Sequence, residues 1–250
     1  MPRKILALAA GPVSLLVDAL LAVLLPPLCA LCRSRRPEGG SAFCTGCLGG
    51  FTPLWEPFCS VCGVPFDGAG PSHPCGRCLS DPPPFTDLRA WGLYRGSLLE
   101  AVHAFKYRKA LCLREGLERL ALQAFDRHWG AAHFSAAVPV PCHLSTLRRR
   151  GFDLPALLSR RLSHARDIPW RPRALAKVRK TADLVGLGIR ERAEAVAGAY
   201  DAAEGLQGRV LLVDDVATST STARACAEAC LSAGAAEVSV LVLARTPLLT

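Results

Sequence analysis

Two adjacent acids and a run of small hydroxyl residues near the C-terminus are the residues best suited to chemistry. Asp214 and Asp215 follow a wholly apolar stretch, and the residues from Thr218 to Thr222 come shortly after them. Carboxylates would repel a phosphate, but they accept hydrogen bonds from vicinal sugar hydroxyls and suit a nearby divalent cation. Small hydroxyl side chains at a helix start favour a bound phosphate. The pattern therefore predicts a sugar phosphate ligand.

The same residues also allow a purely structural interpretation. In that case the strand ends in a polar turn, and Thr218 or Ser219 is an ordinary helix cap. The apolar stretch 210–213 before the acids and the alanine-rich stretch after them favour the ligand site. Ligands of open α/β sheets bind just beyond the carboxyl ends of the strands.

The elements that must position this site alternate between strands and helices. The pattern predicts strands at 88–94, 136–140, 174–178, 210–213 and 238–244. It predicts helices at 97–107, 111–129, 189–199 and 221–233, and another from about residue 152, after a polar loop. This succession is typical of a parallel α/β sheet flanked by helices, with both acids just past the end of a buried strand.

Eight of the twelve cysteines form four Cys-x-x-Cys pairs within 50 residues. This spacing is typical of zinc ribbons, in which two pairs supply the four thiolates of one tetrahedral site. The intervals 33–43 and 63–74 suit one ribbon each, although the sequence leaves open how the pairs share their metals. We expect about two structural Zn²⁺ ions held by Cys29, Cys32, Cys44, Cys47, Cys59, Cys62, Cys75 and Cys78. Zinc implies a reducing, cytoplasmic location, whereas the alternative, a disulfide module, implies export.

The chain carries a formal charge of +9, from 30 Lys and Arg against 21 Asp and Glu. Basic clusters at 148–150 and 177–180 favour polyanionic partners such as phosphates, pyrophosphate or nucleic acid. For scattered basic positions, simple solubilisation is an equal alternative.

An apolar segment opens the chain. Gly11-Pro12 and Asp18 interrupt it and leave a helical piece of about 13 residues, or about 20 Å, too short to cross a bilayer. We expect a docked or amphipathic helix and no membrane span, with a cleaved signal as the alternative. The chain then divides into an apolar helix at 1–28, a zinc-ribbon module at 29–80 and an α/β domain at 88–250, after a stiff linker at 81–84.

Several blocks of the sequence resemble a known family. The segment 208–222 is similar to the signature with which type I phosphoribosyltransferases bind phosphoribosyl pyrophosphate (PRPP). Five other segments resemble blocks of the ComF (competence protein F) family, described as amidophosphoribosyltransferase-like. The first three are the zinc-finger opening Pro26 to Cys32, Tyr94-Arg95-Gly96 and Phe105-Lys106-Tyr107. The fourth is the pyrophosphate-side loop, Val138 to Pro141 followed by Arg148 and Arg150-Gly151-Phe152, and the fifth is a mobile loop with Arg179, Thr181 and Arg192. Together these blocks cover essentially the whole chain.

The resemblance implies a type I phosphoribosyltransferase-like sheet, with PRPP or a related sugar phosphate and Mg²⁺ as ligands. Asp214 and Asp215 would hold the ribose hydroxyls and Mg²⁺-bound PRPP, while Arg148 and Arg150 would neutralise the departing pyrophosphate. The other implied ligand contacts are Thr218, Ser219, Thr220, Ser221 and Thr222 at the 5′-phosphate, Val140 and Pro141 at the pyrophosphate, Lys106, and Arg179, Thr181 and Arg192 on a water-excluding lid.

The chain departs from the family pattern at several polar positions. The family usually has glycine at Thr220, Asn-Gln at Asp153-Leu154, glutamine at Leu184 and asparagine at Ala195. We expect Thr220→Gly to tighten PRPP binding, because a β-branched residue restricts the loop dihedrals. If the native dihedrals suit threonine, glycine would also lower stability by about 1 kcal/mol.

Three functions remain open from the sequence. One is an enzyme that transfers phosphoribose from PRPP to an unidentified acceptor. The second is a protein that handles single-stranded DNA in natural transformation beside a helicase partner, as the family resemblance implies; aromatic residues, at 6%, are sparse for base stacking. The third is a PRPP-sensing regulator without chemistry. The lost polar positions favour the second or third function over efficient turnover.

Overall fold

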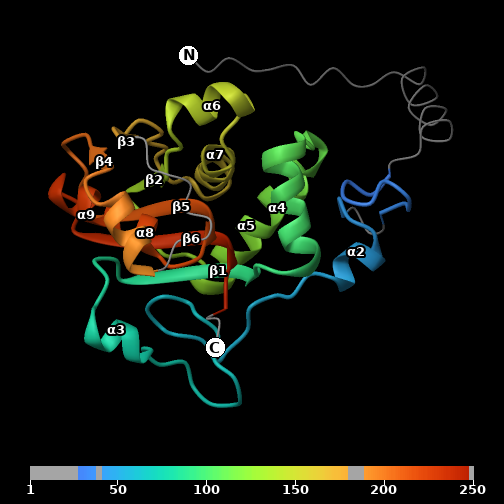
Figure 1. Ribbon diagram of the computed structural model, residues 1–250, viewed down its shortest axis with the longest axis horizontal. Coiled ribbons are helices and arrows are strands. Elements are labelled where there is room, and N and C mark those ends of the chain that lie inside the picture. Colours follow the sequence, from blue (N-terminus) through green and yellow to red (C-terminus); the bar gives the residue numbers. More distant parts are fainter. Residues whose placement is uncertain (1–27, 38–40, 180–188, 248–250) are drawn as a thin grey trace.

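The computed structural model describes residues 28–37, 41–179 and 189–247 (Figure 1). The apolar segment expected to form the first helix, Thr181 and Leu184 lie outside these ranges. The elements in chain order are α2 (Thr45–Gly49), α3 (Gly76–Ser80), β1 (Asp87–Leu93), α4 (Gly96–Arg108), η1 (Leu111–Leu113), α5 (Arg114–His128), β2 (Ala136–Pro139), α6 (Leu144–Arg150), α7 (Leu154–Arg166), β3 (Leu175–Lys177), α8 (Ile189–Val196), β4 (Tyr200–Ala202), β5 (Arg209–Ala217), α9 (Ser221–Ser232) and β6 (Glu237–Arg245).

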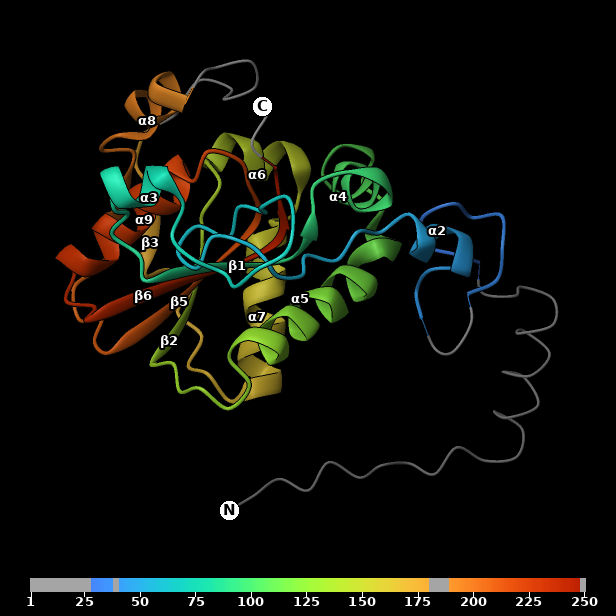
Figure 2. The ribbon, with the colours of Figure 1, turned by 90° about the horizontal axis from the view of Figure 1, so that it is seen from below.

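A parallel sheet of four strands, in the order β1-β6-β5-β2, forms the centre of the molecule. The central strands β5 and β6 are almost continuously apolar, as strands covered on both faces must be. Helices α5 and α7 pack on one face, whereas α9 packs on the other (Figure 2). The predicted parallel α/β architecture is confirmed.

The position of the two acids differs from the prediction. Strand β5 continues to Ala217, so Asp214 and Asp215 lie within it and not past its end. The extension forms because β6 keeps pairing with β5, with Asp214 opposite Val242 and Ala217 opposite Arg245. On the other side, β2 stops opposite Val213. The acids therefore lie where β5 has lost one neighbour, which opens that edge to a ligand.

Two elements near the site were not predicted from the sequence. Helix α6 forms inside the expected polar loop, where the His143 side chain accepts a hydrogen bond from the Ser145 backbone N–H. Strand β4 pairs with β3 in a small antiparallel sheet, with Lys177 opposite Tyr200. This pairing joins segments more than 20 residues apart and leaves no local sequence pattern.

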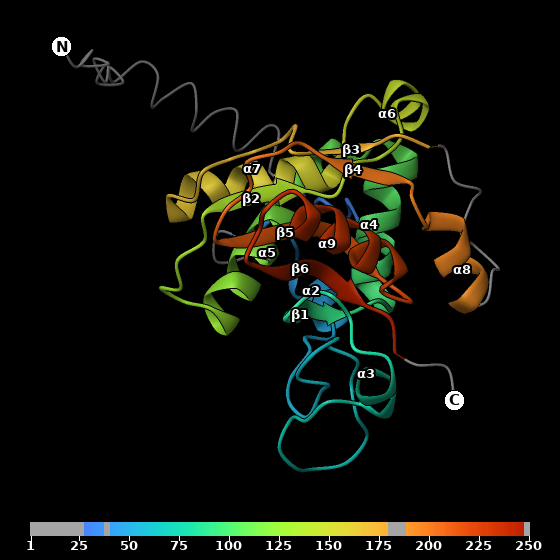
Figure 3. The ribbon, with the colours of Figure 1, turned by 90° about the vertical axis from the view of Figure 1, so that its left-hand side faces the viewer.

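The two halves of the cysteine-rich region lie on different sides of the molecule, with α2 beside α4 (Figures 1 and 2) and α3 below β1 (Figures 1 and 3). Phe43 of the first half joins the core under α4 and α5, and it packs so closely on Gly116 that a β-carbon there would lie 2.5 Å from its ring. In the second half, the carbonyl oxygen of Val61 accepts a hydrogen bond from the N–H of Leu88 in β1 at 2.7 Å. Each half is thus packed directly onto the α/β domain.

No helix within the described ranges is long and apolar enough to cross a bilayer.

Candidate ligand cleft and zinc centres

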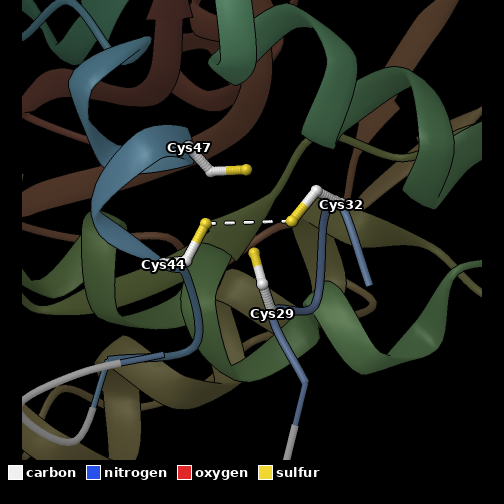
Figure 4. A group of neighbouring side chains, drawn as sticks. All are labelled: Cys29, Cys32, Cys44 and Cys47. Carbon is white, nitrogen blue, oxygen red and sulfur yellow. Dashed lines mark hydrogen bonds between the residues drawn. The ribbon is translucent and has the colours of Figure 1, made fainter. Parts of the chain in front are cut away.

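The eight paired cysteines gather into two sets of four. Cys29, Cys32, Cys44 and Cys47 form the first set (Figure 4), and Cys59, Cys62, Cys75 and Cys78 form the second. Within each set all four sulfur atoms lie within 4.8 Å of one another. The Cys32–Cys44 and Cys62–Cys75 sulfur pairs are 3.8 Å apart. That separation is far longer than a disulfide and equals the edge of a tetrahedron with Zn–S bonds of about 2.3 Å. Both sets fit zinc.

Hydrogen bonds in the second set prepare a thiolate for the metal. The backbone N–H groups of Cys62 and Cys75 donate to the Cys59 sulfur at 3.3 and 3.2 Å. Burial opposes ionisation, but these donors outweigh it and lower the pKa of Cys59 to about 7. All four cysteines of this set are buried, whereas Cys32 and Cys47 of the first set are more accessible to solvent. The second site is therefore the more protected one.

A cleft of about 780 Å³ opens beside the free edge of β5. Its walls come from β5, from the N-terminus of α9, from α4, from the β2–α7 segment that includes α6, and from the β3–β4 pair. The residues that line it are Lys106, Tyr107, Val140, Pro141, Cys142, His143, Ser145, Thr146, Arg149, Arg150, Phe152, Asp153, Leu154, Pro155, Lys177, Tyr200, Asp214, Asp215, Val216, Thr218 and Thr222. The region predicted to bind the ligand thus contains a cleft.

The floor of the cleft combines a cation with several carboxylates. The Nζ of Lys106 lies 2.6 Å from Oδ1 of the buried Asp215, and the Asp215 N–H donates to Oδ1 of Asp214. Burial and the neighbouring Asp215 raise the pKa of Asp214 to about 7. Burial, with a smaller contribution from Asp215, also raises the pKa of Asp153 to about 6. This floor can therefore accept hydrogen bonds and bind a divalent cation.

The hydroxyl loop, residues Thr218 to Thr222, curls from the end of β5 into the first turn of α9. Thr218 and Thr222 line the main cleft, while Ser219 and Ser221 are buried with their hydroxyl oxygens 2.9 Å apart. A second small cavity of about 30 Å³ lies within the loop. The first N–H groups of α9 have no intrahelical partners, so the loop can offer them to an anion.

Thr220 holds a backbone conformation that threonine rarely adopts. Its φ of 65° and ψ of 1° lie in the left-handed region, immediately before α9. For an L-residue this region costs about 1–2 kcal/mol, and β-branched residues are outliers there. The loop therefore keeps a glycine-type conformation with threonine in place.

This conformation reverses the stability expected for Thr220→Gly. Glycine relieves the strain and adds unfolded-state entropy, so we expect a net stabilisation of up to about 1 kcal/mol, or about 2–4 °C in Tm. Differential scanning calorimetry of the variant and the wild type measures this change. A lower Tm in the variant would show that the Thr220 side chain contributes more than its strained backbone costs.

The structure brings most predicted site residues together. Asp214, Asp215, Lys106, Val140, Pro141, Arg150, Thr218 and Thr222 line the cleft, and Ser219, Thr220 and Ser221 line the small cavity of the loop. Arg148 is exposed and is not among the cleft-lining residues, whereas its neighbour Arg149 is.

Of the expected lid residues, the structure describes the side-chain contacts of Arg179. The guanidinium of Arg179 donates to the carbonyl oxygens of Ala195 and Ala197, at the end of α8. Arg192 falls within α8, which packs on α9. The structure therefore gives Arg179 a contact with its own chain rather than a place in the cleft wall.

Several cleft residues were absent from the predicted site, and three of them carry titratable side chains on its floor or on the β3–β4 side. Asp153 was recognised only as a departure from the family pattern, and Lys177 only as part of a basic cluster. Tyr200 carries no sequence signal, because it reaches the cleft through the β3–β4 pairing. The Lys177 ammonium lies 5.2 Å from the centre of the Tyr200 ring. Burial raises the pKa of Tyr200 and lowers that of Lys177.

The fold and the two cysteine sets define a parallel α/β protein with two ribbon-type zinc centres.

Comparisons with known proteins support the zinc centres and show the family of the chain. Residues 20–79 match the double zinc ribbon domain. The chain is 34% identical over 225 residues to the DNA utilization protein YhgH of Salmonella typhimurium, covering 88% of this chain and 98% of that protein. It is 34% identical over 226 residues to YhgH of Escherichia coli K12, with the same coverage. It is also 29% identical over 224 residues to competence protein F of Haemophilus influenzae, covering 87% and 96%. The chain belongs to the family of YhgH and competence protein F, the ComF family.

Proposed function

We propose that the cleft binds PRPP with Mg²⁺ and that the chain uses this site in DNA utilization. The observation that carries the proposal is the junction of β5 and α9, where two acids precede a left-handed loop at a helix start. The acids of this junction can bind sugar hydroxyls, and the loop at the start of α9 can bind a phosphate. The arginines on the α6 wall of the cleft favour a second anionic group on the same ligand.

The ribose part of the ligand would lie on the acids. Asp214 can accept hydrogen bonds from the 2′- and 3′-hydroxyls, and the second oxygen of Asp215 is a further acceptor beside it. Lys106 balances one of the two charges, so the floor is less repulsive to an anionic ligand than two free carboxylates would be. The 5′-phosphate would lie on the hydroxyl loop, against the N-terminus of α9.

The pyrophosphate would lie against the wall formed by α6. Arg149 and Arg150 line that wall. The Nε of Arg150 is buried and has no hydrogen-bond partner among the described residues, so it is a donor in need of an acceptor. The carboxylate oxygens of the floor match the ligands that Mg²⁺ takes, usually together with phosphate oxygens of the substrate. Mg²⁺ would supply charge neutralisation for the pyrophosphate.

These contacts also define what transfer would require. In phosphoribosyl transfer a nucleophile bonds to C1 of the ribose while pyrophosphate leaves with the electron pair of the C–O bond. Arg149 and Arg150 would stabilise the negative charge on the leaving group. Asp153 opposes the effect of these arginines, because it adds a carboxylate close to Asp215. Asp153 is therefore expected to weaken both the binding of the anionic ligand and its turnover.

Asp153→Asn is expected to tighten Mg²⁺·PRPP binding by about three- to tenfold, because it removes one like charge from the floor. The amide oxygen can still accept the hydrogen bond that the Cys142 N–H donates to Asp153 at 3.4 Å. Calorimetric titration of the variant and the wild type measures the difference. Weaker binding by the variant would show that the Asp153 carboxylate is itself a ligand contact.

Handling of single-stranded DNA is a second candidate function, favoured by three exposed aromatic side chains. Trp55, Tyr107 and Trp170 are 63%, 57% and 37% exposed. An arginine lies over each ring, with Arg127, Arg150 and Arg160 at 4.1, 5.0 and 5.7 Å from the ring centres. Aromatic rings beside arginines are typical stacking sites for unpaired bases. The relatives' names, DNA utilization protein and competence protein F, agree with this function.

Titration of the zinc-loaded chain with Mg²⁺·PRPP, ribose 5-phosphate and an unstructured oligonucleotide tests both candidates. The first proposal predicts saturable binding of one PRPP per chain, and weaker binding of ribose 5-phosphate because it lacks pyrophosphate. If the chain binds only the oligonucleotide, with an affinity that falls steeply as the salt concentration rises, the PRPP proposal is wrong and handling of single-stranded DNA is supported.

A further inference from the structure

A single buried arginine connects the second zinc site to the hydroxyl loop. Arg245, the last residue of β6, is 3% exposed. Its Nε donates to the carbonyl oxygen of Cys62 at 2.9 Å. Its Nη1 donates to the carbonyl oxygens of Ala217 at 3.0 Å and of Thr218. One guanidinium thus holds a zinc-ligand residue and the first residue of the loop at the same time.

Further contacts join the two regions beside this bridge. A small cavity is lined by Cys62, Cys75 and Cys78 of the second site and by Thr220 of the hydroxyl loop. Behind it, Arg224 in the second turn of α9 forms a salt bridge of 3.2 Å with Asp81, the residue after α3. The strained residue of the loop therefore lies against the cysteine cluster.

The charges of the bridge match a zinc-bound site. Four thiolates and one Zn²⁺ carry a formal charge of about −2, which a buried cation nearby offsets. If the metal leaves, the thiolates repel one another or take up protons, and the ribbon around them loses its main constraint. The Cys62 carbonyl then no longer has a fixed position from which to hold Arg245.

We propose that Arg245 couples the two sites, so that the hydroxyl loop keeps its anion-binding shape only while the second cysteine set holds zinc. The inference rests on the proposed function, in which this loop binds the 5′-phosphate. The first zinc site packs against α4 and α5, on the other side of the molecule, and serves as an internal reference.

Coupling between two sites is reciprocal, so the ligand must also protect the metal. The test uses the zinc-loaded full chain under reducing conditions, challenged with a zinc-selective chelator and pulsed with an alkylating reagent. Mass spectrometry then gives the alkylation rate of each cysteine with and without Mg²⁺·PRPP. We expect PRPP to slow alkylation of the second set at least about fivefold and to leave the first set unchanged. Equal effects on both sets, or none at a saturating PRPP concentration, would overturn the coupling.

Arg245→Lys gives the matching variant test. Lysine keeps the charge, but one ammonium cannot reach both the Cys62 carbonyl and the loop carbonyls. We expect two zinc ions per chain, PRPP affinity at least about tenfold lower, and loss of the selective protection. Arg89→Lys is the control, because Arg89 of β1 also donates to a carbonyl of the second cysteine-rich half, that of Ser60, but lies opposite Leu241 and away from the loop. It should bind PRPP as the wild type does.

The outcomes separate the two proposals. If the zinc-loaded wild type binds no PRPP, the proposed function fails, and this inference fails with it. If the wild type binds PRPP and Arg245→Lys binds it equally well with full protection of the second set, only the coupling is wrong.

Discussion

Asp214→Asn is expected to weaken Mg²⁺·PRPP binding by about a hundredfold or more. Asp214 lies on the free edge of β5, where its carboxylate faces the cleft. Hydrogen bonds to a charged partner contribute about 1.5–3 kcal/mol each, and a carboxylate that holds two ribose hydroxyls makes two of them. The amide keeps one acceptor and loses the charge. Isothermal titration calorimetry measures the loss.

The fold should tolerate this change well. The Asp214 carboxylate is held with a pKa of about 7, far above its ordinary value, so its ionised form destabilises the folded state. The folded state therefore binds more protons than the unfolded state between about pH 4 and pH 7, and its stability falls as pH rises through this window. Asp214→Asn should remove that part of the pH dependence and raise Tm at pH 8. Thermal unfolding of both proteins at pH 5 and pH 8 measures it.

Asp215 is a poorer choice for the same test. From the sequence, both acids were expected to lie past the end of the strand. Asp215 instead lies within β5, is buried and is the ion-pair partner of Lys106. Its removal leaves a buried ammonium unpaired, at a cost of about 3–5 kcal/mol. Asp201→Asn, at an exposed carboxylate on β4, is the matched control for Asp214→Asn and should bind PRPP normally.

Removal of zinc is expected to have the largest effect on stability. Both cysteine sets lie between ribbon loops that also pack on the main cores, through Phe43 on one side and Leu54 and Phe58 on the other. Structural zinc sites contribute on the order of 10 kcal/mol to folding. Loss of even half of this from a chain of this size lowers Tm by more than about 10 °C. Calorimetry before and after chelation, with elemental analysis showing two zinc ions per chain, measures the effect.

Single ligand changes should differ between the two sites. Cys75→Ser removes a ligand from the fully buried second set, whereas Cys32→Ser alters the more accessible first set. We expect the first variant to lose more in Tm than the second. A Tm unaffected by chelation, or disulfides in protein prepared without oxidants, would contradict the zinc assignment.

The sequence predicted the sheet well, because its strands are apolar runs. The stretches around Val210 and Val238 alternate with helices in a way that few architectures other than a parallel sheet allow. The spacing of the cysteines indicated zinc ribbons but left open which pairs share a metal, and the structure supplies that grouping. The end of β5 could not be predicted from the sequence, because it depends on pairing with β6, which is a tertiary contact.

The residues at the centre of the candidate cleft were identified from the sequence, whereas several residues at its edge were not. Asp214 and Thr222 lie close in sequence, so a local pattern could identify them. Tyr200 and Lys177 reach the cleft only through a long-range pairing, and Arg149 replaces Arg148 because of the rotation of a helix that the sequence did not predict. The left-handed backbone at Thr220 was equally hidden, because threonine is among the residues least expected there.

A crystal structure of the zinc-loaded chain grown with Mg²⁺·PRPP would show whether the cleft binds this ligand. We expect the 5′-phosphate within hydrogen-bond distance of the backbone N–H groups at the start of α9, the ribose hydroxyls on Asp214, and the pyrophosphate beside Arg149 and Arg150. PRPP bound elsewhere on the chain, or a cleft without ligand at a PRPP concentration that saturates other sites, would contradict it.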